Sequence, residues 1–73
     1  MKKYVISVWN SYATLCIENE GDDTLEYSLV DIPENLYQAV QDYIDSQVDL
    51  TESIVYPVTE EALKGLKEIG LDL

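Results

Sequence analysis

The sequence contains no histidine and no arginine, and these absences exclude most familiar catalytic chemistry. Histidine is the most common general base and a frequent metal ligand in proteins, so neither a Ser-His-Asp nor a Cys-His arrangement can form within the chain. We therefore expect no enzyme activity, no metal site and no cofactor. Two alternatives stay open, because carboxylates are plentiful: a small enzyme that works with carboxylates alone, and a calcium site.

Cysteine is also scarce. Cys16 stands alone in the sequence, which excludes an intramolecular disulfide and a disulfide-stapled secreted scaffold. Because it lies in an apolar run of an acidic chain, we expect a packed thiol and not a reactive one. The apolar run after Lys3 stops at Asn10, too short for a signal peptide, and no stretch approaches the roughly 20 apolar residues of a membrane span. The sequence predicts a cytoplasmic protein.

Positive charge is confined to the two ends of the chain. Four lysines stand against 15 aspartates and glutamates, for a formal net charge of -11, and residues 4–63 contain no lysine. Most of the surface must therefore be electronegative. Such a surface disfavours direct binding to nucleic acid or to an anionic membrane, and it favours association with cationic partners. The alternative is that the acidity only keeps the protein soluble.

The chain contains enough apolar sequence for one small core. With 73 residues, 47% of them hydrophobic, it has room for a single domain over residues 1–73 and for no second core. A domain of this size is only marginally stable alone. A homodimer, which would add buried surface, is therefore left open.

The first thirty residues predict a three-stranded antiparallel meander. Apolar and β-branched residues dominate positions 4–9, as in a strand covered on both faces, and residues 13–17 resume the apolar run after the turn signal Asn10-Ser11. After a second turn at residues 20–23, the alternation over residues 24–30 predicts a strand with one wet face. Its predicted buried side chains are Leu25, Tyr27 and Leu29, and Tyr4 and Tyr43 are also placed in the core.

Two amphipathic helices complete the predicted fold. Asp31, Pro33 and Glu34 form a capping-box-like start for a first helix that ends near Asp49. Its apolar face, expected to lie on the sheet, contains Leu36, Ala39, Val40, Tyr43, Ile44 and Val48.

The last quarter of the chain predicts a doubtful strand and a second helix. Ser53–Val58 is rich in β-formers but contains Pro57, so it is an edge strand or an extended connector. Thr59 caps the second helix and Gly70 ends it. The fold class is therefore α+β, in the order of a three-stranded antiparallel meander, a helix, the doubtful edge strand and a second helix.

One row of carboxylates suggests a binding face. Glu34, Asp42, Asp45 and Asp49 fall within an arc of about 80° on the first predicted helix, opposite its apolar side. No lysine relieves their repulsion, which costs the helix a few tenths of a kcal/mol for each pair, and a solubilising face usually mixes both signs of charge. The spacing resembles the phosphates along one strand of a duplex. We take these four residues as the core of a partner-binding face; the alternative is a solvated helix face.

A second acidic cluster lies at the turn around Gly21. Its spacing does not match a calcium-binding loop of the EF-hand type, because Cys16 would occupy the first ligand position. A solvated hairpin turn is therefore favoured. We also predict that Asp22 and Asp23 contact the partner, but that they contribute less to binding than the four acids of the helical row.

These observations favour an interaction protein. We expect it to bind a basic partner, such as a nucleic-acid-binding protein or a nuclease, and to inhibit or regulate it, because a basic groove that selects rows of anions also accepts an acidic protein. By charge and size alone, this is typical of phage-encoded anti-defence inhibitors, DNA mimics, and antitoxin or immunity proteins. The alternative from another class is a non-enzymatic oligomeric adaptor or subunit.

Overall fold

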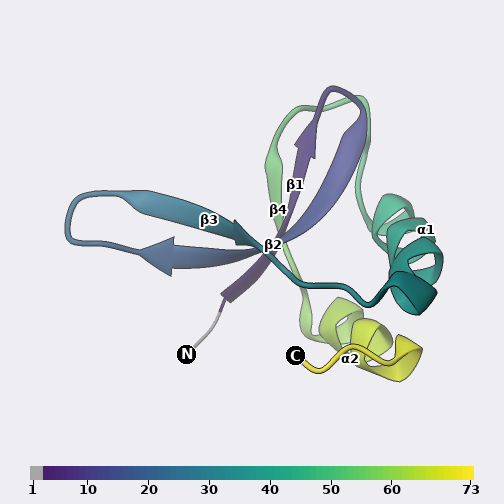
Figure 1. Cartoon of the computed structure of the whole chain (residues 1–73). Helices are drawn as coiled ribbons and strands as arrows, with labels where there is room; N and C mark the ends of the chain where they lie inside the picture. The colour runs from purple at the N-terminus through teal and green to yellow at the C-terminus, as the bar shows by residue number, and fades with distance from the viewer. Residues whose placement is uncertain (1–2) are drawn as a thin grey trace.

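The computed structural model describes residues 3–73 as one antiparallel sheet with two helices (Figure 1). The strands lie in the order β3-β2-β1-β4. Their bounds are β1 (Lys3–Trp9), β2 (Tyr12–Glu20), β3 (Leu25–Leu29) and β4 (Val55–Pro57). A 3-10 turn η1 (Glu34–Leu36) leads into α1 (Tyr37–Gln47), and α2 (Glu60–Ile69) follows β4. The predicted α+β class and the three-stranded meander before the first helix are confirmed.

The first hairpin is closed by a two-residue turn. Asn10 and Ser11 both have positive φ, at 56° and 63°, as a type I′ turn requires, and asparagine tolerates this region better than most residues. The turn fixes the register, which pairs Trp9 with Tyr12 and Val5 with Cys16. The turn signal in the sequence is thus a true hairpin.

The doubtful segment before the second helix forms a short edge strand. β4 pairs antiparallel with β1, with Val5 opposite Pro57, and the Val8 N–H donates to the Ile54 carbonyl at 2.9 Å. Because β4 is the last strand of the sheet, the missing N–H of Pro57 is tolerated there.

The first helix starts later than the sequence predicted. Pro33 has ψ 140°, an extended conformation, and no side chain caps η1 or α1. Asp31 therefore lies outside the helix, and its predicted capping role is wrong. The helix also ends earlier, because Val48 adopts an extended conformation and leaves Asp49 in the following turn.

The second helix has both predicted caps. The Ala62 N–H donates to Thr59 Oγ1 at 3.1 Å. At the other end, Gly70 takes φ 128° and its N–H donates to the Lys67 carbonyl at 3.1 Å. Glycine adopts this positive φ without the Cβ strain that other residues would meet.

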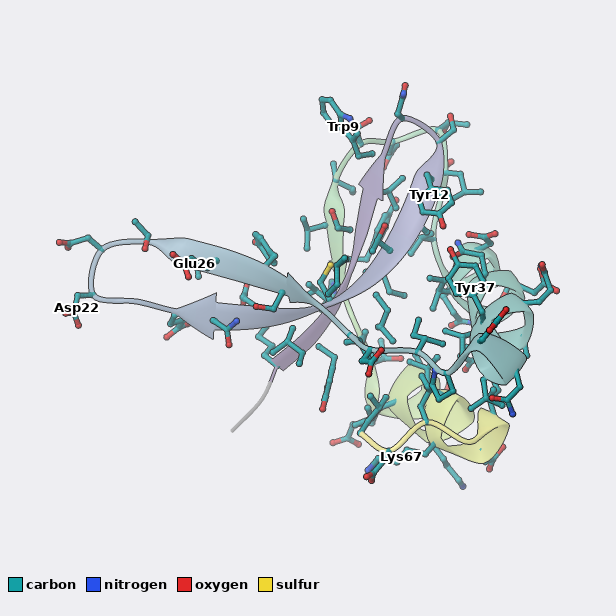
Figure 2. The ribbon with its side chains drawn as sticks, viewed as in Figure 1. Trp9, Tyr12, Asp22, Glu26, Tyr37 and Lys67 are labelled. Carbon is teal, nitrogen blue, oxygen red and sulfur yellow. The ribbon has the colours of Figure 1, made fainter. Side chains whose placement is uncertain are left out.

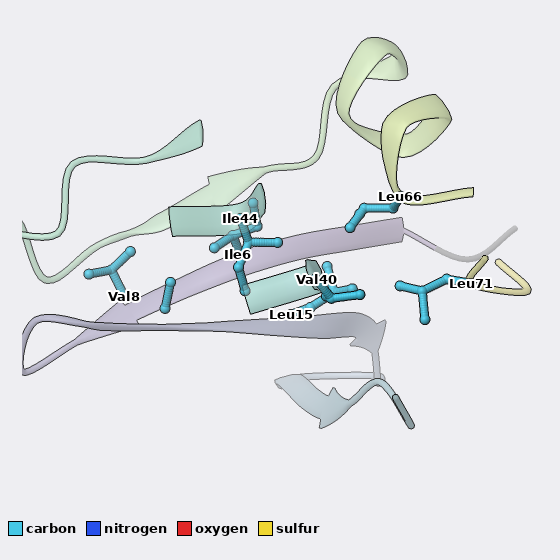
Figure 3. Packing of buried hydrophobic residues seen from close by; sticks show 8 residues of the cluster. Ile6, Val8, Leu15, Val40, Ile44, Leu66 and Leu71 are labelled. Atoms are coloured by element: carbon cyan, nitrogen blue, oxygen red, sulfur yellow. The ribbon is translucent and has the colours of Figure 1, made fainter. Parts of the chain in front are cut away.

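The core lies between the two helices and one face of the sheet (Figure 3). It is built from eight buried apolar residues: Ile6, Val8, Ala13, Leu15, Val40, Ile44, Leu66 and Leu71. The prediction that Ala39 belongs to the apolar face of α1 packed on the sheet is wrong, because Ala39 is exposed. Tyr4 and Tyr43 are half-buried.

The sheet is strongly coiled, and this leaves one part of it without cover. The ribbon formed by β3 and the second half of β2 runs away from both helices (Figure 1), and every residue of β3 is exposed. The prediction that Leu25, Tyr27 and Leu29 are buried is therefore wrong. The alternation is real, but its apolar side lies on the face of the sheet opposite the core, and the two helices, of ten and eleven residues, pack on the core face. Within residues 3–73, no helix is long and apolar enough to cross a bilayer.

Candidate interaction site

The side of the sheet that faces away from the helices is mainly apolar at its centre. Cross-strand pairing places Leu29, Cys16, Val5 and Pro57 in one row across all four strands. Successive residues of a strand point to opposite sides, so this row lies opposite the core residues Ile6 and Leu15. We call this side the helix-free face; its apolar members are Val5, Trp9, Tyr12, Cys16, Leu25, Tyr27, Leu29, Val55 and Pro57.

The middle of the helix-free face is closed and its periphery is open. Val5 and Cys16, on the two inner strands, are buried, at 2% and 5% exposure. Trp9 and Leu29 are each 74% exposed and Tyr27 is 45% exposed. The prediction that the first strand is covered on both faces is thus wrong at Trp9, which stands at the tip of the first hairpin (Figure 2). Large exposed apolar side chains gathered on one surface are typical of interaction sites.

A polar rim borders this apolar surface. Glu18 lies beside Tyr27 in the ladder, and Tyr27 Oη donates to Glu18 Oε1 at 3.4 Å. Lys3 Nζ approaches Glu18 Oε2 at 3.1 Å. This is the single ion pair among the residues that the structure describes, so the remaining carboxylates there are not neutralised by a neighbouring lysine.

The predicted acidic residues Asp22 and Asp23 lie at the end of the same ribbon. Both are exposed in the loop between β2 and β3, which is closed by a bond from the Gly21 N–H to the Thr24 carbonyl at 2.8 Å. Asp22 and Glu26 mark the projecting part of the ribbon in Figure 2, far from α1. The ribbon therefore combines an apolar stripe with concentrated negative charge.

The predicted acidic row on the first helix is only partly formed. Asp42 is exposed and accepts from Gln38 Nε2 at 2.8 Å. Asp45 is half-buried and accepts from Gln41 Nε2 at 3.0 Å. The Gln41 amide also donates to the Ala13 carbonyl at 2.9 Å, so Asp45 helps to hold α1 on β2.

The two ends of the predicted row lie outside the α-helix. Glu34 begins η1 and is exposed, and Asp49 lies in the turn after α1. Asp49 Oδ1 accepts from the Thr51 N–H at 2.9 Å and from Thr51 Oγ1 at 2.6 Å, and these bonds lower the pKa of the Asp49 carboxyl. The four acids are thus split among three local structures and do not form one helical stripe.

A small groove lies beside the contact of α1 with β2 and the end of β3. It has a volume of about 320 Å³ and is lined by Leu29, Ile32 and Tyr37 among others. At its rim the hydroxyls of Tyr12 and Tyr37 share a short hydrogen bond of 2.5 Å, which raises the pKa of Tyr12. Because Leu29 also belongs to the helix-free face, this groove extends the apolar surface towards α1.

The single cysteine of the chain is not in an activating environment. Burial raises the pKa of the Cys16 thiol, which favours the unreactive protonated form. Among residues 3–73, no three acidic or thiol side chains are grouped so that they could hold a metal ion. The arrangement is suited to binding by surface contact and charge.

The helix-free face is the candidate interaction site that sequence reasoning missed. The alternation of Leu25, Tyr27 and Leu29 was visible, as was the large Trp9 on the opposite face of its strand from Ile6. The missing step was to compare areas, because two helices of about three turns each do not cover both faces of a four-stranded sheet. Comparison of the chain with family models, with curated proteins and with solved structures finds no match.

Proposed function

We propose that this protein is a small acidic interaction protein that binds a basic protein and thereby inhibits or regulates it. A nucleic-acid-binding protein or a nuclease is the partner class that fits best, because its basic surface already selects anions. Inhibition then follows from occupancy: the acidic protein covers the surface that the nucleic acid needs, in the manner of an anti-defence inhibitor or DNA mimic.

The observation that carries this proposal is the exposed apolar stripe on an acidic ribbon. Leu25, Tyr27 and Leu29 are exposed on β3, and Glu18, Asp22 and Asp23 lie around them. An apolar centre with a charged rim is the usual anatomy of a protein interface. The stripe supplies surface to bury, and the rim selects a partner of opposite charge.

The net charge also favours a partner other than a second copy of the chain. The formal net charge is -11, so two copies repel each other, whereas a cationic protein is attracted over about 10 Å at moderate salt. A second candidate function, an oligomeric adaptor, is favoured by the same exposed apolar stripe, since a second copy would also bury it. Sedimentation of the free protein over a wide concentration range separates the two functions.

The proposal is tested by capture of partners from a lysate at about 0.05 M and about 0.5 M salt, followed by affinity measurements with the purified partner. We expect a basic protein that is retained at low salt and released at high salt. Replacing Tyr27 and Leu29 with serine should weaken its binding, because the apolar centre of the interface is removed. Absence of any salt-sensitive basic partner would refute the proposed function.

Three matched charge reversals locate the acidic contribution. Asp22→Lys with Asp23→Lys changes the ribbon, and Glu34→Lys with Asp42→Lys changes the region of α1. Glu61→Lys with Glu68→Lys makes the same charge change on exposed positions of α2. We expect the ribbon pair to weaken binding most, mainly through the association rate. Equal effects of all three pairs would mean that only the overall charge matters.

A further inference from the structure

β3 forms an open edge of the sheet, and two hydrogen bonds show which of its backbone groups are free. The strand is terminal in the order β3-β2-β1-β4. On either side of it, the Gly21 N–H donates to the Thr24 carbonyl at 2.8 Å, and the Val30 N–H donates to the Leu15 carbonyl at 3.1 Å. In an antiparallel pair, residues that bond to the partner strand alternate with residues that do not. The bonds of Thr24 and Val30 therefore fix which residues of β3 point their backbone groups towards β2 and which point them outwards; we call this alternation the phase of the strand.

This phase leaves three residues of β3 with outward backbone groups. Glu26 and Ser28 are an even number of positions from Thr24, so their N–H and carbonyl groups point to β2. The groups of Leu25, Tyr27 and Leu29 point away from the sheet, where no strand pairs with them in the part of the chain that the structure describes. An edge of this kind is a ready template for another extended chain.

The same three residues carry the apolar side chains of β3. Leu25, Tyr27 and Leu29 are exposed on the helix-free face, and Glu26 and Ser28 point to the opposite side. A chain added to this edge would thus meet apolar side chains on one side and a carboxylate on the other. The pattern fits a strand in which apolar residues alternate with lysine or arginine.

A second copy of the chain fits this edge poorly because of its charge. Pairing about a two-fold axis at Tyr27 would place Leu25 opposite Leu29, which is favourable. It would also bring Asp23 opposite Asp31 of the second copy, and like charges directly opposite destabilise a strand pair. Each ribbon would carry its unneutralised carboxylates into the contact. A basic segment meets the same edge without this repulsion.

We propose that the free edge of β3 binds an extended basic segment of the partner as a fifth strand, with its apolar side chains beside Leu25, Tyr27 and Leu29 and its basic side chains towards Glu26. This inference rests on the proposed function, to which it adds the mode of docking. Backbone hydrogen bonds to the three outward residues hold the segment, and the alternation of its side chains selects it.

The test uses the full chain and a synthetic peptide of about ten residues in which lysine alternates with valine. A peptide of glutamate alternating with valine is the charge control. Amide hydrogen exchange is measured residue by residue, with and without peptide. We expect the lysine peptide to protect the amides of Leu25, Tyr27 and Leu29, whereas Glu26 and Ser28 are already protected in the free protein.

A pair of variants tests the backbone contribution separately. Tyr27→Ala removes the side chain, and Tyr27→Pro removes the side chain together with the outward N–H. Because that N–H makes no bond to β2, proline is tolerated at this edge, and circular dichroism checks the fold. We expect the lysine peptide to bind the proline variant roughly ten-fold more weakly than the alanine variant. If the proline variant does not fold, hydrogen exchange of the unaltered chain decides.

The other outcomes would overturn the edge proposal in distinguishable ways. Salt-sensitive binding of the lysine peptide without protection of the three amides would refute docking at the edge and leave the proposed function standing. Equal protection by the glutamate peptide would refute the role of charge. Protection in the free protein that rises with its concentration would assign the edge to a second copy.

Discussion

At the residue scale, Val40 is one of three core residues that are 0% exposed, together with Ala13 and Leu66. Val40→Asp would bury a carboxylate with no partner, which costs several kcal/mol. The total stability expected of a domain this size is of the order of 5 kcal/mol. We therefore expect the variant to lose its cooperative unfolding transition in circular dichroism.

The neighbouring residue provides the control for this change. Ala39 is exposed one position earlier on α1. Ala39→Asp therefore introduces an aspartate, as Val40→Asp does, but at a position where the carboxylate stays in solvent. This control should remain folded, with a change of about 0.5 kcal/mol or less. A folded, cooperative Val40→Asp variant would contradict the packing of α1 on the sheet.

A second residue-scale feature is the close approach of the helices at Gly65. A Cβ atom added there would collide with the ring and hydroxyl of Tyr43 on α1. Alanine normally stabilises a helix interior by about 1 kcal/mol relative to glycine. Here we expect Gly65→Ala to destabilise the protein by about 1 kcal/mol, because the Tyr43 ring must move.

The explanation is tested by a double-mutant cycle in urea. In a Tyr43→Leu background the ring is absent, so Gly65→Ala should stabilise by about 1 kcal/mol through helix propensity. The change of sign between the two backgrounds identifies the steric contact. Stabilisation in both backgrounds would show that Gly65 is not needed for helix packing, and destabilisation in both would show that the Tyr43 ring is not the cause.

At the scale of elements, the positions of the strands and helix caps follow closely from local sequence. Which face of each strand is covered by a helix does not. Asn10-Ser11, Thr59 and Gly70 act through their own backbone and side-chain chemistry, so their roles were predictable. The alternation in β3 was equally local. It shows that the two sides of a strand differ, but what packs on either side depends on the coiling of the sheet and on the length of distant helices.

The candidate site was predictable to the same extent. The acidic row assumed one continuous helix from Glu34 to Asp49, but residues 34–36 form the 3-10 turn η1 and Val48 is extended, so α1 occupies only the middle of that range. The sequence therefore identified individual exposed carboxylates, but it did not predict correctly which of them share one surface. Asp45 departs further, because the Gln41 amide that donates to it also donates to the Ala13 carbonyl of β2, a tertiary contact that helical spacing does not show.

The status of β3 as an uncovered strand gives an element-scale prediction. Leu25→Thr with Leu29→Thr keeps a good strand former at exposed positions, so the free energy of unfolding should change by about 0.5 kcal/mol or less. Leu15→Thr, at a buried position of β2, should cost several kcal/mol. Urea midpoints measure both. A comparable loss in the β3 variant would show that this face is covered, and would remove the basis of the interaction site.

At the scale of the whole molecule, charge acts in opposite directions on folding and on binding. The net charge of -11 and the single ion pair within residues 3–73 mean that compaction brings like charges together. Salt screens this repulsion, with a Debye length that falls from about 30 Å at 0.01 M to about 3 Å at 1 M. Salt also screens the attraction to a basic partner. The free protein should therefore be stabilised by the same salt that releases its partner.

This opposition gives a prediction that needs no partner to begin with. Raising sodium chloride from about 0.02 M to about 0.5 M should raise the Tm of the free protein by about 5 °C, which corresponds to roughly 1 kcal/mol in a domain of this size. Glu61→Lys with Glu68→Lys makes the net charge less negative and should reduce that rise. A general effect of salt on apolar surface would instead raise both Tm values equally. A Tm that does not rise with salt would show that repulsion between carboxylates does not measurably destabilise the fold. The acidity would then carry no cost to stability, and such a cost could not be used to argue that the carboxylates serve binding.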